Sequence, residues 1–128
     1  MRFGGTVVYV DDVPATVDFY QRAFGLKVRF ADEDLGYIDF ETGGSSLAIA
    51  AHSLGEMLMP GAYRRRTPSG VEIAFLTENV SDAYAKIVAA GAQGVAPPKR
   101  MPWGLEVAYL RAPEGTLIGL SEPPPTLG

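Results

Sequence analysis

Two stretches of the sequence, TVVYVDDV at residues 6–13 and IAFLTENV at residues 73–80, decide the fold. Each begins with apolar, β-branched or aromatic residues typical of a buried strand, and then reaches a residue that favours a helix N-cap, Asp12 or Asn79. An offset of 67 residues places Asp12 on Asn79, and self-similarity of this kind indicates an internal duplication. The sequence therefore predicts two related modules.

The two halves continue with the same order of elements. A helix is expected after each stretch, with Gly25 and Gly91 as the residues that end it. Three short strands follow each helix, at residues 26–30, 37–41 and 46–51 in the first half and at 93–96, 105–110 and 116–120 in the second. The fold class is thus α+β, with two βαβββ modules. Because each sheet would carry a helix on one face only, we expect the sheets to face each other as an open eight-stranded barrel or cup, with the helices outside and a ligand cleft within.

We expect a single domain made of these two repeats. The segments are a first module at residues 1–53, a connecting loop at 54–70, a second module at 71–122 and a Pro-rich tail at 123–128. Glycines and prolines interrupt the chain from His52 onward, so the connection is expected to be irregular from that residue. The run Arg64–Arg66 within it is either a solvated charge run or a group that steers an anionic ligand.

Composition excludes several classes of protein. The chain has 128 residues, no cysteine and one histidine, which rules out disulfides, thiolate catalysis, iron–sulfur clusters and sites with two or three histidines from one chain. The net charge of −4 argues against nucleic acid as a partner. No apolar run approaches the roughly 18 residues that span a membrane, and no signal-peptide pattern opens the chain, so we expect a cytoplasmic protein without a membrane partner.

Several short motifs occur together along nearly the whole chain. They are Val7–Asp12, Asp18-Phe19-Tyr20, Phe24-Gly25-Leu26, Pro102-Trp103-Gly104, Ala112-Pro113-Glu114-Gly115 and Leu117–Glu122. In combination they resemble the vicinal oxygen chelate superfamily, which includes glyoxalase I, the bleomycin-resistance proteins and the extradiol dioxygenases. The resemblance implies the duplicated fold expected above, with a ligand held in the cup.

In metal-using members of that superfamily, four inward positions on the first and last strands of each module hold the ion. The resemblance places them on Gly5, Ala48 (or Ala50), Glu72 and Gly119. Only Glu72 has a side chain that binds metals, and one carboxylate does not hold a divalent ion. We therefore expect no metal and no other cofactor. The chain is closest in character to the metal-free, drug-binding resistance proteins of the superfamily.

The candidate ligand-binding residues combine the resemblance with strand alternation and small side chains. They are Trp103, Tyr9, Val7, Glu72, Ala48, Ala50, Leu76, Gly119, Met57 and Met59. The resemblance gives Trp103 the role of stacking on a flat ligand ring, and the alternatives are a place in the core or in a dimer interface. The small residues leave room for an apolar guest unless neighbouring side chains fill it. Met57 and Met59 suit a lid over a promiscuous pocket or else pack against the barrel or a second subunit.

Two residues bear on catalysis. Glu72 has two interpretations. It either lies in the cleft, where it binds a ligand or acts as a base, or it is an edge carboxylate paired with an arginine. Burial in the cleft would raise its pKa. His52 is expected to end a strand beside Ser53, whose side chain would then point to the opposite face, so a Ser–His pair is disfavoured and a surface or rim position is favoured.

Two functions follow from these residues. The first is a homodimeric, metal-independent protein that sequesters a hydrophobic or aromatic compound, as the resistance proteins against bleomycin or mitomycin do. The alternative is a metal-independent isomerase or lyase that uses Glu72 as its general base. A regulatory or partner-binding domain with an empty barrel is the third possibility. Pairing of the modules within one chain or across a dimer is left open.

Overall fold

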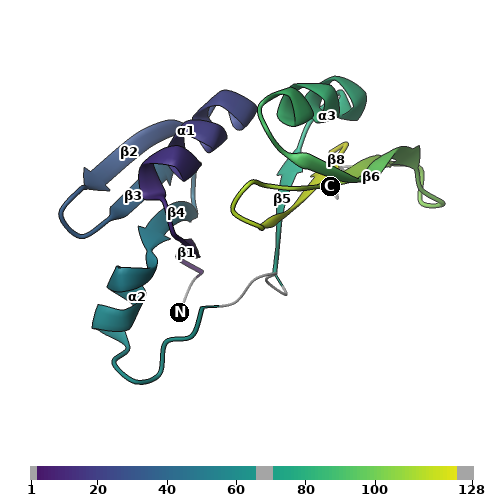
Figure 1. Ribbon diagram of the computed structural model, residues 1–128. Coiled ribbons are helices and arrows are strands. Elements are labelled where there is room, and N and C mark those ends of the chain that lie inside the picture. The colour runs from purple at the N-terminus through teal and green to yellow at the C-terminus, as the bar shows by residue number, and fades with distance from the viewer. Residues whose placement is uncertain (1–2, 66–70, 124–128) are drawn as a thin grey trace. The chain divides into compact units, whose positions relative to one another are not determined.

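The computed structural model describes residues 3–65 and 71–123, which belong to two compact units, Met1–Arg66 and Thr67–Gly128. Figure 1 shows both units, and we call them module 1 and module 2. Each contains one mixed four-stranded sheet with a helix packed on one face. The predicted α+β fold with two βαβββ modules is therefore confirmed. In the described part of the chain, no helix has the length and apolar character needed to cross a membrane.

Module 1 contains the strands β1 (Gly5–Val10), β2 (Lys27–Asp32), β3 (Tyr37–Glu41) and β4 (Ser46–Ala51), together with α1 (Val13–Phe24) and α2 (His52–Leu58). The sheet order is β1-β4-β3-β2, in which β1 runs parallel to β4 and the other pairs are antiparallel. This order makes β1 and β2 the edge strands of the sheet.

Helix α1 begins and ends where the sequence indicates. Asp12 caps its N-terminus by accepting a hydrogen bond from the backbone N–H of Ala15 at 3.0 Å, and Gly25 ends it in the left-handed conformation with φ 68°. The apolar side of the helix buries Phe19 and Tyr20, and the Tyr20 ring lies 6.2 Å from that of Phe40 in β3. The core of module 1 therefore lies between α1 and one face of its sheet.

Module 2 repeats this plan with β5 (Glu72–Leu76), α3 (Val80–Ala89), β6 (Gln93–Arg100), β7 (Glu106–Arg111) and β8 (Leu117–Ser121). The sheet order is β5-β8-β7-β6. Asn79 caps α3 by accepting from the backbone N–H of Asp82 at 3.0 Å. Val80 and Ile87 of α3 are buried, and α3 packs on β6, β7 and β8. Gly94 lies under α3, where a Cβ atom would overlap the hydroxyl of Tyr84.

Two expectations about the chain path are wrong. The connection that was expected to be irregular from His52 begins as a helix, α2, and the strand that was expected at residues 93–96 continues to Arg100. Breaks in the β6–β7 register accompany Pro97 and Pro98, and the strand tolerates these prolines because it lies at the edge of the sheet. The distal part of the connection, residues 66–70, and most of the Pro-rich tail, residues 124–128, lie outside the described residues.

Candidate functional site

The face of the module 1 sheet opposite α1 carries most of the candidate residues of this module. Pairing of β1 with β4 and of β4 with β3 puts Val7, Ala48 and Asp39 side by side on this face, and Tyr9 beside Ala50 in the next row. We call it the helix-free face of module 1. Val7 is 43% exposed, whereas Ala48 and Ala50 are fully buried. Val7, Tyr9, Ala48 and Ala50 therefore share one face of the module 1 sheet.

A hydrogen-bonded ion pair crosses this face. Nε of Arg29 donates to Oδ2 of Asp39 at 3.1 Å, its Nη2 donates to the same oxygen, and the hydroxyl of Ser46 donates to Oδ1. Burial alone would raise the pKa of Asp39, but the hydrogen bonds from Ser46 and Arg29 and the guanidinium charge outweigh it and hold that pKa below its usual range. Because both of its oxygens accept hydrogen bonds, Asp39 links β2, β3 and β4 within the sheet.

The helix-free face of module 2, opposite α3, presents a carboxylate among small and apolar residues. Register places Glu72 beside Leu117, and Ala74 beside Gly119 and Tyr109. Glu72 is exposed. A Cβ atom on Gly119 would lie 2.7 Å from Oε1 of Glu72 and 3.3 Å from the Tyr109 ring. The carboxylate of Glu72 thus occupies the space that the missing side chain leaves.

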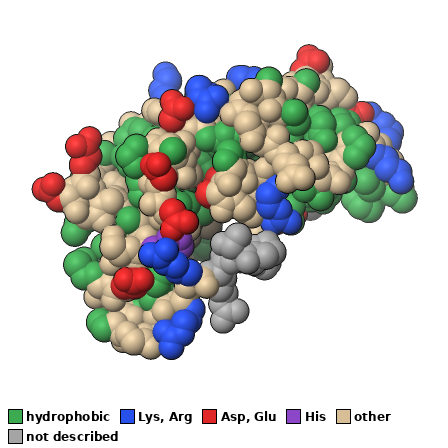
Figure 2. All heavy atoms as spheres, viewed as in Figure 1, with side chains coloured by type: hydrophobic (Ala, Val, Ile, Leu, Met, Phe, Trp, Pro, Cys, Tyr) green, Lys and Arg blue, Asp and Glu red, His purple; other side chains and the backbone are tan. Residues whose placement is uncertain are grey.

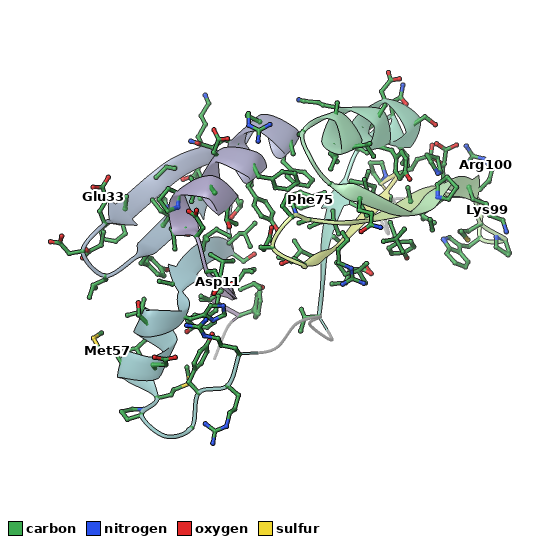
Figure 3. All side chains as sticks on the ribbon, viewed as in Figure 1. Asp11, Glu33, Met57, Phe75, Lys99 and Arg100 are labelled. Carbon is green, nitrogen blue, oxygen red and sulfur yellow. The ribbon has the colours of Figure 1, made fainter. Side chains whose placement is uncertain are left out.

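Trp103 lies in the turn between β6 and β7 and is 67% exposed, so the alternative of a core tryptophan is wrong. Nη1 of Arg100 donates to the carbonyl of Gly104 at 2.6 Å and to Oε1 of Glu122 at 3.0 Å, which fixes this turn. Figure 2 shows hydrophobic and basic side chains together at this end of the hairpin, and Figure 3 places Lys99 and Arg100 there.

The other candidates are spread over both modules. Leu76 is 63% exposed and shares the helix-free face of module 2 with Glu72. Met57 and Met59 are exposed on α2 and directly after it, and Met57 points outward from that helix (Figure 3). The structure therefore groups Val7, Tyr9, Ala48 and Ala50 on one face of module 1, and Glu72, Leu76 and Gly119 on one face of module 2.

His52 lies at the start of α2 and not at the end of a strand, so the geometric argument about Ser53 does not apply. Its Nδ1 shares a hydrogen bond with the hydroxyl of Tyr63, and its Nε2 lies 3.7 Å from Oδ1 of Asp11. Burial of Tyr63 raises the pKa of its phenol above the usual value, and the neighbouring Tyr9 adds to this.

Sequence reasoning did not identify Tyr109, Asp39 or Tyr63 as residues of these regions. Alternation along β7 could have placed Tyr109 on the same face as Glu72, because Leu105–Leu110 was already expected to be a strand. The position of Asp39 between the apolar residues Ile38 and Phe40 of β3 was a further signal. Nothing in the local sequence indicates the contact between Tyr63 and His52, since it depends on α2 turning the chain back.

The side chains at the positions that the resemblance assigns to a metal ion do not fit the ion that many members of that superfamily use. Of the four positions that the resemblance assigns to the ion, only Glu72 has a metal-binding side chain, and the space above Gly119 is filled by Glu72 itself. Over residues 3–65 and 71–123, no group of three His, Cys, Asp or Glu side chains gathers to hold an ion. We therefore derive no step through a bound metal.

A family model for the Glyoxalase/Bleomycin resistance protein/Dioxygenase superfamily matches residues 2–120. The chain belongs to this superfamily. The resemblance inferred from its motifs is thereby confirmed. Among curated proteins, none matches this member of the superfamily in sequence.

Solved structures agree with the superfamily fold. A glyoxalase-related enzyme from Fulvimarina pelagi is 21% identical with a TM-score of 0.86, covering 97% of this chain and 89% of its own. A glyoxalase/bleomycin resistance protein/dioxygenase family enzyme from Burkholderia phytofirmans PsJN is 20% identical with a TM-score of 0.82, and the match covers 93% of this chain and 96% of that enzyme. TioX from Micromonospora sp. ML1 is 21% identical with a TM-score of 0.71, and the match covers 95% of this chain and 98% of TioX. At these identities the likeness concerns the fold alone.

Proposed function

We propose that this superfamily member binds a small hydrophobic or aromatic compound, without a metal ion, through the helix-free face of a module. The observation that carries this proposal is the position of Glu72. Among the four positions that the resemblance assigns to a metal ion, only Glu72 has a side chain that could bind one. Its carboxylate lies over Gly119, beside the Tyr109 ring. A lone carboxylate among small and aromatic neighbours suits a ligand that is mainly apolar and carries a hydrogen-bond donor. Drugs of the kind that resistance proteins of the superfamily bind are candidate ligands.

Accessible apolar groups supply the driving force for such binding. Leu76 is 63% exposed, and Ala74 between it and Glu72 is also exposed. Covering apolar surface contributes roughly 25 cal/mol per Å². The ring of Tyr109 offers a wall for a flat ligand, and stacking adds about 0.5–1.5 kcal/mol.

The test uses N-phenyl-1-naphthylamine, an uncharged aromatic probe that fluoresces when it leaves water. We expect it to bind the whole chain, and we expect Leu76→Asp to abolish the signal because a charge then stands on the helix-free face. Val88→Asp is the matched control, because Val88 is also exposed, at 41%, but lies on α3. Equal loss in both variants, or no binding by the natural chain, contradicts the proposal.

A second candidate function is a metal-independent isomerase or lyase with Glu72 as general base. The observation that favours it is the exposed carboxylate, which a bound carbonyl compound can reach. Glu72→Gln keeps the shape of the side chain and removes the base. Turnover on a panel of small carbonyl compounds that falls at least about a hundredfold in this variant supports the enzyme, whereas unchanged rates rule it out.

We further propose a cytoplasmic homodimer. The edge strand β2 exposes Val28 at 38% and Phe30 at 54%, and exposed apolar side chains on an edge strand favour pairing with another chain. Sedimentation equilibrium is expected to give twice the chain mass of 13.7 kDa. A single species at the chain mass contradicts the dimer.

A further inference from the structure

The only histidine of the chain lies in a polar cluster at one end of the module 1 sheet. Nδ1 of His52 is hydrogen-bonded to the Tyr63 hydroxyl, and Nε2 lies 3.7 Å from Oδ1 of Asp11. Nη1 of Arg65 donates to the same Asp11 oxygen at 3.0 Å. We call these four residues the His52 cluster. Figure 2 shows acidic and basic side chains beside the histidine in this region, and Figure 3 labels Asp11.

The cluster adjoins the helix-free face of module 1 through two aromatic rings. The ring of Tyr63 meets that of Tyr9 edge to face, with centroids 5.1 Å apart, and Tyr9 belongs to this face. Gly55 of α2 allows this position, because a Cβ atom there would lie 2.6 Å from the Tyr63 ring. Tyr63 as a whole residue is half-buried.

The acidic neighbour of the ring favours one direction for the hydrogen bond between His52 and Tyr63. A neutral imidazole has one N–H and one bare nitrogen, and the Asp11 carboxylate only accepts. The proton of neutral His52 is therefore favoured on Nε2, which faces Asp11, and Nδ1 accepts the proton of the Tyr63 hydroxyl. In this state the hydroxyl proton of Tyr63 is engaged by His52.

Protonation of His52 reverses this bond. Both ring nitrogens then carry a proton, so Nδ1 donates and the Tyr63 oxygen accepts. The hydroxyl proton of Tyr63 becomes free for another acceptor. The charged groups that face the ring are Asp11 after β1 and Arg65 beyond α2, with Glu56 of α2 lying 3.9 Å from Nε of Arg65.

We propose that Tyr63 is a ligand-binding group that donates a hydrogen bond to a carbonyl oxygen of an aromatic compound when His52 is protonated. This inference rests on the proposed binding function and names a substrate class for it, namely aromatic ketones and related carbonyl compounds. Histidine is the side chain that ordinarily changes charge between about pH 5 and pH 8. The affinity for such a compound therefore rises about three- to tenfold as the pH falls through this range, the worth of one hydrogen bond.

The direction of the hydrogen bond is tested without any ligand. Because His52 is the only histidine, long-range ¹H–¹⁵N spectra of the labelled chain show one imidazole. We expect the neutral ring to carry its proton on Nε2, and we expect Tyr63→Phe to shift the Nδ1 resonance. A neutral ring protonated on Nδ1, or an Nδ1 resonance unchanged in Tyr63→Phe, overturns the proposal.

The ligand is tested with acetophenone, which has an accepting carbonyl, and with ethylbenzene, which has none. Calorimetry at about pH 5.5 and about pH 8 is expected to show tighter binding of acetophenone at the lower pH and equal binding of ethylbenzene at both. Tyr63→Phe should remove the pH dependence for acetophenone, and Tyr84→Phe on α3 should keep it. If neither compound binds although N-phenyl-1-naphthylamine does, this inference fails alone; if none of the three compounds binds, the proposed function fails with it. Ethylbenzene binding combined with pH-independent acetophenone binding overturns this inference alone.

Discussion

The carboxylate of Glu72 lies over Gly119, with Oε1 2.7 Å from the point where a side chain at position 119 would begin. The two residues come from β5 and β8, neighbouring strands of one sheet, and Tyr109 of β7 closes the third side. The absence of a side chain at Gly119 thus leaves the space that the carboxylate of Glu72 occupies.

Gly119→Ala is expected to move Glu72 with little loss of stability. The new methyl group meets the far end of a flexible side chain, so the carboxylate swings outward and the free energy of unfolding falls by about 1 kcal/mol or less. Gly94→Ala is the contrast, because its methyl group would overlap the Tyr84 hydroxyl under α3 and is expected to cost about 1–3 kcal/mol. Urea denaturation measures both, and equal losses would contradict the packing described here.

Asp39→Ala is expected to destabilise the chain by about 1–3 kcal/mol at neutral pH, since it removes the acceptor for Arg29 and Ser46. The pKa of Asp39 is lowered in the folded chain, so its contribution is present above the unfolded pKa of about 3.9 and is lost as the pH falls through the folded value. The difference between natural chain and variant should therefore shrink in acid. Glu33→Ala, whose side chain points outward from the turn after β2 in Figure 3, should show no such change.

Gly55→Ala is expected to displace the Tyr63 ring, because the added methyl group would lie 2.6 Å from it. We expect a loss of about 1–3 kcal/mol together with altered NMR signals of Tyr9 and His52, which contact Tyr63. Gly44→Ala is the matched control, since nothing lies within 4 Å of its Cβ position. Unchanged Tyr9 and His52 signals in the Gly55 variant would show that Tyr63 is not held against α2.

Trp103→Phe is expected to change the free energy of unfolding by no more than about 0.5 kcal/mol, because the indole is 67% exposed in a turn. The transition is followed by circular dichroism, which does not depend on this tryptophan. A loss of about 3 kcal/mol or more would instead indicate a buried ring.

Much of the fold could be predicted from the sequence because its signals are local. The caps at Asp12 and Asn79 and the stop at Gly25 were identified from residue type alone, and the structure shows each of them. Helix α2 could not be predicted, since Gly55 lies within it and no side chain caps it. That helix is supported by its packing against β4 and β1, which is a tertiary effect.

The candidate site was predictable only in part. Strand alternation placed Tyr9 and Val7 on one face, and Glu72 and Leu76 on another, but it carries no information about contacts made across turns. The His52–Tyr63 bond joins residues eleven apart through a helix that the sequence did not indicate. The exposure of Trp103 follows from the length of β6, which exceeded its expected end by four residues.

The glycines at two of the family's metal positions constrain the evolution of this lineage. A side chain at Gly5 would begin 2.5 Å from the main-chain oxygen of Ser46, and one at Gly119 would collide with the carboxylate that it would have to assist. Restoring an ion-binding centre would therefore demand a shift of β1 and a new path for Glu72 before any added ligand brought an advantage. Substitution of Gly5 alone passes through an unfavourable intermediate, and a new side chain at Gly119 adds no ligand until Glu72 has moved, so descendants of this chain are expected to diversify by changing which organic molecules they accept.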